Sequence, residues 1–150
     1  MNNHIYHYAC RILDVYDGDT MTVEIDLGFN LKLTDKVRLY EVNAPEIRGK
    51  SKKKGIEVKM ETVYRLLGRN EDVKKYAPIP QEIIRDFLKT PRPFMIQTVQ
   101  NSKKIKTWYK KEKRGKYGRW LGVIWYKNEN DQWQSLNEDL KEMGYEAHYE

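Results

Sequence analysis

Two aspartates on a tight turn are the first residues of this chain that could do chemistry. Asp17 and Asp19 flank Gly18, which brings two carboxylates to one bend of the backbone. A hard cation such as calcium takes oxygen ligands of this kind in proteins. The same Asp-Gly-Asp pattern also occurs in ordinary hairpin turns, so a metal site and a plain turn both stay open at this point.

In a second segment, VRLYEVNAPE over residues 37–46, a cation and an acid lie eight positions apart. Arg38 falls inside an expected strand, and Glu46 comes directly after Pro45. A guanidinium can form two parallel hydrogen bonds to phosphate oxygens, and a carboxylate nearby can accept a proton from water. An Arg and a Glu in this arrangement are also compatible with a surface ion pair, which contributes little to stability.

A third segment, KYGRWL over residues 116–121, places an aromatic ring and two cations in one locality. Arg119 follows Gly118 at the start of an expected strand, and Tyr117 lies two residues before it. Base stacking and phosphate binding both use aromatic side chains interleaved with cations. The three segments are far apart in the chain, so a shared site depends on the elements that bring them together.

The residues around the first turn alternate between apolar and polar, as strand residues do. Residues 8–16 and residues 21–27 flank the Asp-Gly-Asp turn, and their period predicts a β-hairpin. A second turn signal follows at residues 28–30, and residues 31–42 read as a third strand that ends before Pro45. The first part of the chain is therefore predicted to be a three-stranded meander.

The middle of the chain has helical periodicity instead. Apolar residues in the stretch 55–67 recur at helical spacing, and Gly68 supplies a C-terminal stop. Residues 69–80 read as a linker. A short amphipathic helix follows at residues 81–90, and Pro91 closes it.

The remaining segments predict strands and a final helix. Residues 93–100 and 117–126 read as strands, residues 104–112 as the arm of a hairpin, and residues 135–145 as a helix with Ser135 at its N-cap. This order of elements is compatible with a five-stranded barrel that carries two or three helices on its outside. We therefore expect a mainly β protein with helices, of the α+β class.

The net charge is +6, from 28 Lys and Arg against 22 Asp and Glu, and the excess is concentrated in two stretches. This asymmetry suits a polyanion held along one face by phosphate contacts, an interaction that weakens as salt rises. A solvated basic surface is the alternative. The basic residues of the two stretches are Arg48, Lys50, Lys52, Lys53, Lys54, and then Lys103, Lys104, Lys106, Lys110, Lys111, Lys113, Arg114, Lys116 and Arg119.

The chain has no sequence sign of export or of a membrane anchor. The single Cys10 cannot form an intrachain disulfide, and the N-terminal residues show no basic region followed by an apolar one. No apolar run approaches the roughly 18 residues of a membrane span. We expect a cytoplasmic, monomeric protein with no membrane partner, although a secreted chain trimmed of its signal would look the same.

The segments DGDT, VRLYEVNAPE and KYGRWLG, in this order, resemble the signature segments of the staphylococcal nuclease, or thermonuclease, family. The later segment SLNEDLKEMGY is similar to the family's barrel-closing asparagine and the helix that follows it. The resemblance covers roughly residues 9–125 and this C-terminal segment. It implies an OB-fold β-barrel and a calcium-dependent nuclease that acts on single-stranded or frayed DNA or RNA.

The resemblance also implies a role for each matching residue. Two guanidiniums would hold the scissile phosphate and stabilise its transition state, while a glutamate would act as general base or orient the attacking water. Cleavage of the 5′ P–O bond would leave 3′-phosphates. In these terms the catalytic residues are Arg38, Glu46 and Arg119, the substrate-binding residues are Lys116 and Tyr117, and the calcium ligands are Asp19, Asn43 and the carbonyl of Ala44.

Two features depart from the family pattern. Asn43 stands where the family usually has a second ligand carboxylate, and calcium binding should be weaker because affinity follows ligand charge. Residues 69–93 and 101–115 look like insertions in a single domain of residues 1–150, either shaping a substrate groove or tolerated at the surface. The alternative function is a catalytically silent OB-fold module that binds nucleic acid or a protein, whereas a purely structural adaptor would leave the catalytic set unexplained.

Overall fold

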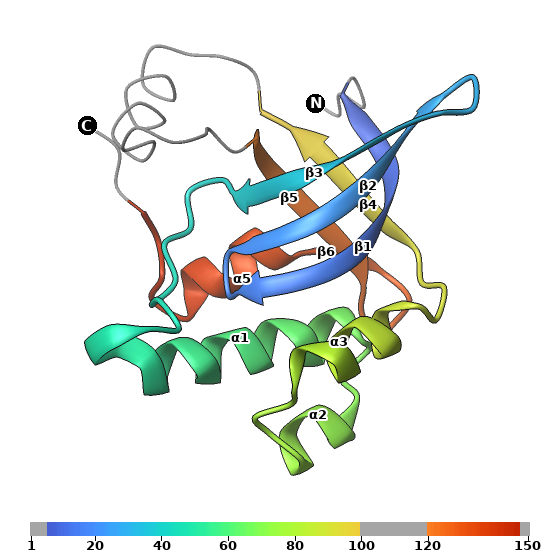
Figure 1. Ribbon diagram of the computed structural model, residues 1–150. Coiled ribbons are helices and arrows are strands. Elements are labelled where there is room, and N and C mark those ends of the chain that lie inside the picture. The colour runs from blue at the N-terminus through green and yellow to red at the C-terminus, as the bar shows by residue number, and fades with distance from the viewer. Residues whose placement is uncertain (1–5, 100–119, 148–150) are drawn as a thin grey trace.

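Five strands close into a barrel in the computed structural model, which describes residues 6–99 and 120–147 (Figure 1). β1, β2 and β3 pair antiparallel in chain order, and β4 pairs with the other edge of β1. β5 pairs antiparallel with β4 and parallel with β3, which joins the two ends of the sheet, and β6 extends the sheet beyond β5. The strands are β1 His7–Asp17, β2 Thr20–Gly28, β3 Leu31–Leu39, β4 Phe94–Thr98, β5 Trp120–Lys127 and β6 Trp133–Ser135.

The alternation of side chains builds the core of this barrel. On β2, Met21, Val23 and Ile25 point inward and are buried, while Thr22 and Glu24 between them are only partly covered. Each apolar side chain of this size contributes roughly 1.5–3 kcal/mol when it is fully buried. A closed mixed barrel with helices outside confirms the predicted class, mainly β with helices, and is consistent with the OB fold.

The third strand is shorter than the sequence predicted. β3 ends at Leu39, whereas the prediction continued it to residue 42. Glu41 has a φ of 64°, in the left-handed region that a strand residue does not adopt. The chain therefore leaves the barrel three residues sooner and enters a loop that contains Asn43 and Ala44.

The helices agree with the prediction except at the linker. Residues 69–80 were predicted to be irregular, but they contain a five-residue helix that is too short to show a periodic signal. Its N-cap is Asn70, whose side chain accepts a hydrogen bond from the Asp72 N–H at 2.9 Å. None of the described helices is long and apolar enough to cross a membrane. The helices are η1 Gly49–Ser51, α1 Lys52–Leu66, α2 Glu71–Lys75, α3 Gln81–Leu88 and α5 Leu136–Glu142.

The later elements confirm the prediction as far as the structure describes them. β4 and β5 fall in the two predicted strands, and β6 is a short addition. The Ser135 hydroxyl accepts a hydrogen bond from the Glu138 N–H at 3.2 Å, which confirms it as the N-cap of α5. Residues 104–112, predicted to form a hairpin arm, lie outside the described residues.

A buried asparagine ties the closing edge of the barrel. The Asn137 side-chain oxygen accepts a hydrogen bond from the Ile124 N–H at 3.0 Å. Its amide group donates to the carbonyls of Tyr40 at 2.9 Å and Gly122 at 3.1 Å. One side chain therefore joins α5, β5 and the end of β3, which is the barrel-closing role that the resemblance implied.

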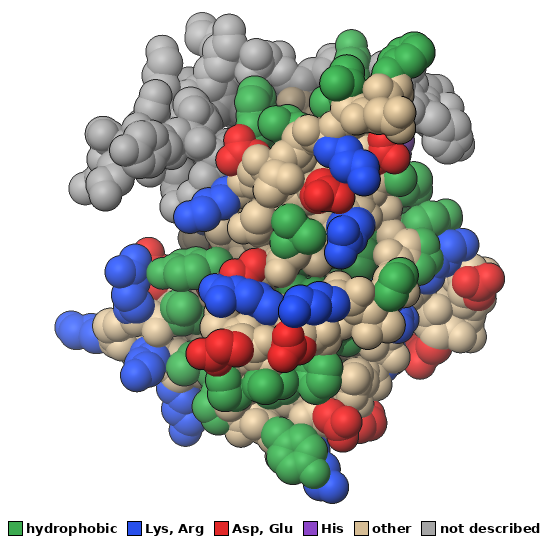
Figure 2. Space-filling view, turned by 45° about the vertical axis from the view of Figure 1, so that its right-hand side comes forward, with side chains coloured by type: hydrophobic (Ala, Val, Ile, Leu, Met, Phe, Trp, Pro, Cys, Tyr) green, Lys and Arg blue, Asp and Glu red, His purple; other side chains and the backbone are tan. Residues whose placement is uncertain are grey.

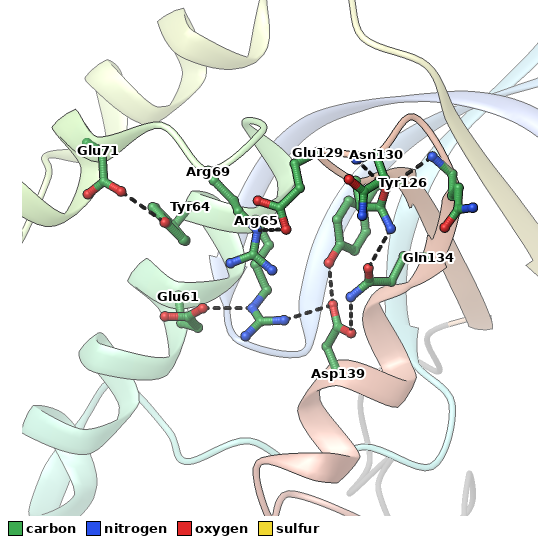
Figure 3. Close-up of polar contacts among 12 residues, drawn as sticks. Glu61, Tyr64, Arg65, Arg69, Glu71, Tyr126, Glu129, Asn130, Gln134 and Asp139 are labelled. Atoms are coloured by element: carbon green, nitrogen blue, oxygen red, sulfur yellow. Dashed lines mark hydrogen bonds and ion pairs between the residues drawn. The ribbon is translucent and has the colours of Figure 1, made fainter.

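A chain of polar contacts joins α1 to α5 and β5 (Figure 3). On α1, Arg65 pairs with Glu61 at 2.7 Å and reaches across to Asp139 on α5 at 3.2 Å. Asp139 also accepts hydrogen bonds from the Tyr126 hydroxyl of β5 and, at 2.6 Å, from Gln134. Because Asp139 is buried and these groups satisfy it, the network sets the position of α1 relative to the barrel.

The Glu61 carboxylate should contribute stability that depends on pH. Burial by itself would raise its pKa, but the hydrogen bond and charge of Arg65, helped by Lys74, hold the pKa below its usual value. A depressed pKa stabilises the fold above the unfolded-state value of about 4.3, and the contribution is lost as pH falls through the folded-state pKa. The free energy of unfolding of Glu61→Gln should therefore be lower than that of the parent at pH 7, with the difference shrinking below about pH 4 in urea titrations. A difference that stays constant from pH 7 to pH 3 would contradict this.

Candidate active site

The turn between β1 and β2 contacts the loop after β3 directly. Asp19 is 2% exposed, and one of its carboxylate oxygens accepts the Ala44 N–H at 2.8 Å. The other oxygen accepts the hydroxyl of Thr20 at 3.1 Å. Two of the three sequence segments are thus joined by a buried, charge-assisted hydrogen bond, a kind stronger than one between neutral groups.

Arg38 lies against the same carboxylate. Its Nη2 donates to the Asn43 side-chain oxygen at 2.9 Å and lies 3.4 Å from Asp19 Oδ2. The guanidinium and the carboxylate are both buried, so water screens their attraction weakly. Since both oxygens lie within 3.4 Å of one nitrogen, the acid and the amide converge on one point.

The carboxyl group of the neighbouring Asp17 has a raised pKa. The pKa of Asp17 is raised to about 7, first by burial and then by the hydrogen bond and charge of Asp19, against the opposing effects of the Asp19 N–H and the charge of Arg38. The Asp19 N–H donates to the Asp17 carboxylate at 3.1 Å. Two carboxylates this close oppose each other's ionisation unless a positive charge lies between them.

The loop that carries Asn43 is held from both sides. On one side the Asn43 N–H donates to the Tyr145 carbonyl at 2.8 Å, and Ala147 donates to the carbonyl of Glu41 at 2.9 Å. On the other side the Ser51 hydroxyl donates to the Glu46 carbonyl at 3.0 Å. Glu46 itself is exposed. A fixed backbone therefore presents a solvent-accessible carboxylate three residues beyond Asn43.

The structure brings Asp19, Arg38, Asn43 and Ala44 into direct contact, as the three-segment hypothesis requires for its first two segments. Glu46 lies on the same loop as two of them. The third segment is mostly outside the described residues, including Lys116, Tyr117 and Arg119. The first described residue of this segment, Trp120, pairs with Val37 next to Arg38.

The oxygen donors present fit a calcium ion by their chemistry. Calcium takes hard oxygen ligands of the kind found here: the carboxylate of Asp19, the amide oxygen of Asn43 and the carbonyl of Ala44. Water or phosphate oxygens can complete its shell. Among the described residues no group of three or more His, Cys, Asp or Glu is arranged to hold a metal. A cation here would thus depend on neutral oxygens as much as on acids.

Sequence patterns gave no role to the residues of α1 that contact the two loops of this site. Thr62 of α1 is fully buried and donates to the Gly18 carbonyl at 3.1 Å, across 44 residues of sequence. Gly55 lies so close to the loop that a Cβ there would be 2.1 Å from the Glu46 carbonyl oxygen. The available signal was a threonine on the apolar face of a helix, one turn from Val58, where a polar group needs a partner.

Fold and site together define a closed β-barrel, consistent with the OB fold, with a polar centre at the end of β3. The sequence model of the family described as Staphylococcal nuclease homologue matches residues 36–150. The chain belongs to this family. Among curated proteins, no match to the chain was found.

Proposed function

We propose that this protein is a calcium-dependent nuclease that hydrolyses phosphodiester bonds of DNA or RNA. The observation that carries the proposal is the contact of Arg38 with Asp19 and Asn43. The exposed Glu46 lies three residues after Asn43 on the same loop. The family to which the chain belongs supports the same activity. An ion pair that only stabilised the surface would be exposed, whereas the pair of Arg38 and Asp19 is buried.

Each residue of the site has a task in this reaction. The guanidinium of Arg38 holds a phosphate oxygen and stabilises the charge that develops on it, an effect worth several kcal/mol for a fixed donor. Glu46 accepts the proton of the attacking water or orients that water. We assign Arg119 as the second guanidinium, and Lys116 and Tyr117 as contacts to the substrate. Calcium held by Asp19, Asn43 and Ala44 would supply positive charge at the phosphate.

A basic surface beside the loop supports a nucleic-acid substrate. The basic segment comprises Arg48, Lys50, Lys52, Lys53 and Lys54, all exposed, at η1 and the start of α1. On the face shown in Figure 2, Lys and Arg side chains gather at the left-hand edge, at the height where α1 begins in Figure 1. Because the segment begins two residues after Glu46, phosphates on either side of a scissile bond can contact it.

Neutralising the basic segment should weaken nucleic-acid binding and its dependence on salt. Changing Lys52, Lys53 and Lys54 to Gln should lower the slope of log K against log[salt] for single-stranded DNA by up to roughly 2, at 0.7 per lost phosphate contact. Fluorescence anisotropy at several salt concentrations measures this slope. Changing Lys32, Lys75 and Lys89 to Gln gives the same change in net charge elsewhere. Equal slopes for the two variants would remove the basic segment from the binding surface.

One observation favours a second function, a silent OB-fold module that binds nucleic acid without cleaving it. Asn43 contributes no negative charge, and its oxygen is engaged by Arg38. A site with fewer acids binds calcium more weakly. The retention of Arg38 and Glu46 together favours the enzyme over this alternative.

A cleavage assay separates the two functions. Purified protein is incubated with single-stranded DNA or with RNA, with calcium or with a chelator, and the ends of the products are analysed. The nuclease gives calcium-dependent fragments with 3′-phosphates. A silent module leaves both polymers intact while still binding them in a mobility-shift assay.

A further inference from the structure

Helix α1 contacts both loops of the candidate site through one face. Gly55, Val58, Lys59 and Thr62 follow at positions i, i+3, i+4 and i+7, which place them on the same side over two helical turns, about 10 Å. Gly55, Val58 and Thr62 each contact a segment that carries a proposed functional residue. Lys59 contacts Gln81. In Figure 1, α1 runs beneath the barrel along the edge where β1 ends.

The first contact holds the turn that carries Asp19. A Cβ on Gly18 would lie 2.6 Å from Val58 Cγ1 and 2.9 Å from Ala44 Cβ, so the turn, the helix and the loop meet at this glycine. The buried hydroxyl of Thr62 donates to the Gly18 carbonyl at 3.1 Å. This hydrogen bond fixes the peptide that links the two aspartates.

The second contact holds the loop that carries Glu46. The backbone of Gly55 packs against the Glu46 carbonyl, with room for no side chain between them. About one turn further along, Lys59 is buried and its ammonium donates to Gln81 at 2.5 Å, and Gln81 donates to the Val15 carbonyl at 2.7 Å near the end of β1. The helix therefore contacts the aspartate turn and the loop opposite it, and is linked to the end of β1 through Gln81.

We propose that α1 sets the spacing between the two loops of the site, and that Thr62 is a positioning residue for Asp19. The helix is itself anchored through Arg65 and Asp139, so it acts as a rigid support. Removing such a supporting partner commonly lowers metal affinity or activity by about 10- to 100-fold. The inference uses the proposed function for its activity readout, but two other readouts are independent of cleavage.

Thr62→Val keeps the shape of the side chain and removes the hydrogen bond. We expect the calcium dissociation constant, measured by calorimetry, to rise about tenfold, and kcat for cleavage to fall by a similar factor with little change in KM. Amide exchange of Asp19 and Ala44 should become about tenfold faster relative to core amides such as Val23, because these two N–H groups lie in the contact that Thr62 supports. Thr62→Ser, which keeps the hydroxyl, should restore all three values.

A matched pair of cavity variants guards against loss of stability as the cause. Val58→Ala removes the side chain that packs on Gly18. Val63→Ala removes an equally buried side chain of the same helix that is not among the nearest neighbours of Gly18 or Gly55. Only Val58→Ala should accelerate exchange at Asp19 and Ala44 relative to the core. Equal local exchange in the two variants, or unchanged exchange in a folded Thr62→Val, overturns the proposal. Failure of the parent to cleave nucleic acid would reject the proposed function and leave the exchange result to decide this inference.

Discussion

Replacing Glu46 with glutamine should lower the rate of calcium-dependent cleavage by roughly 10²- to 10⁴-fold, the range for loss of a general base. The amide keeps the size of the side chain but cannot take a proton from water. Because Glu46 is exposed and its contact with the helix is made by its backbone carbonyl, the fold should be unchanged. Initial rates on a labelled single-stranded oligonucleotide measure the loss.

The control for this variant is Glu57→Gln, which makes the same change on an exposed acid of α1 that pairs with Lys54. It should cleave at nearly the parent rate. Nucleic-acid binding by Glu46→Gln, measured in the presence of a chelator, should be no weaker than that of the parent, since a carboxylate repels phosphate. Cleavage by Glu46→Gln at the parent rate would remove this residue from the mechanism.

Replacing Asn137 with leucine should produce the largest loss of stability. The side chain makes three hydrogen bonds, to Ile124, Tyr40 and Gly122, and a leucine makes none of them. A buried polar group that loses its partner costs roughly 1–3 kcal/mol, so we expect the free energy of unfolding to fall by roughly 3–5 kcal/mol. This is a large part of the 5–15 kcal/mol that is typical of a domain.

Urea unfolding followed by tryptophan fluorescence measures this change, with a constant m value showing that the unfolded state is unaffected. Asn130→Leu, at an exposed position of the turn before β6, should change stability by less than about 0.5 kcal/mol. A loss for Asn137→Leu no greater than that of the control would mean that other groups close the barrel. Activity should fall at least in proportion to the folded fraction. The Tyr40 carbonyl, which loses its donor in this variant, lies three residues before Asn43.

Most elements of the fold were predictable because their signals are local. The alternation on β2 and the helical spacing on α1 arise from one face being buried, and burial leaves a period in the sequence. The errors occurred where no period exists. α2 has five residues, and β3 ends two residues before the left-handed Glu41, which no pattern of side chains indicates. Both depend on how the chain packs after the barrel has closed.

The candidate site was predictable in its residues but not in its contacts. Asp19, Arg38 and Asn43 were selected from motifs of two separate segments, and the structure shows them in contact. No sequence feature indicated that Asp19 would accept the Ala44 N–H or that Asn43 would accept from Arg38. Such hydrogen bonds join residues whose distance depends on strand register and loop geometry.

The sequence by itself determined the strands, the longer helices, the basic segment and the family whose motifs this chain shares, because each leaves a mark within a short stretch of residues. Only the tertiary structure decided that α1 supports both loops, with Thr62 beneath Gly18 and Gly55 against Glu46. The physical reason is that a threonine or a glycine in a helix has the same local pattern whatever lies opposite it. Its partner is chosen by the closure of the barrel, which brings together backbone groups that are 44 residues apart in the case of Thr62 and Gly18.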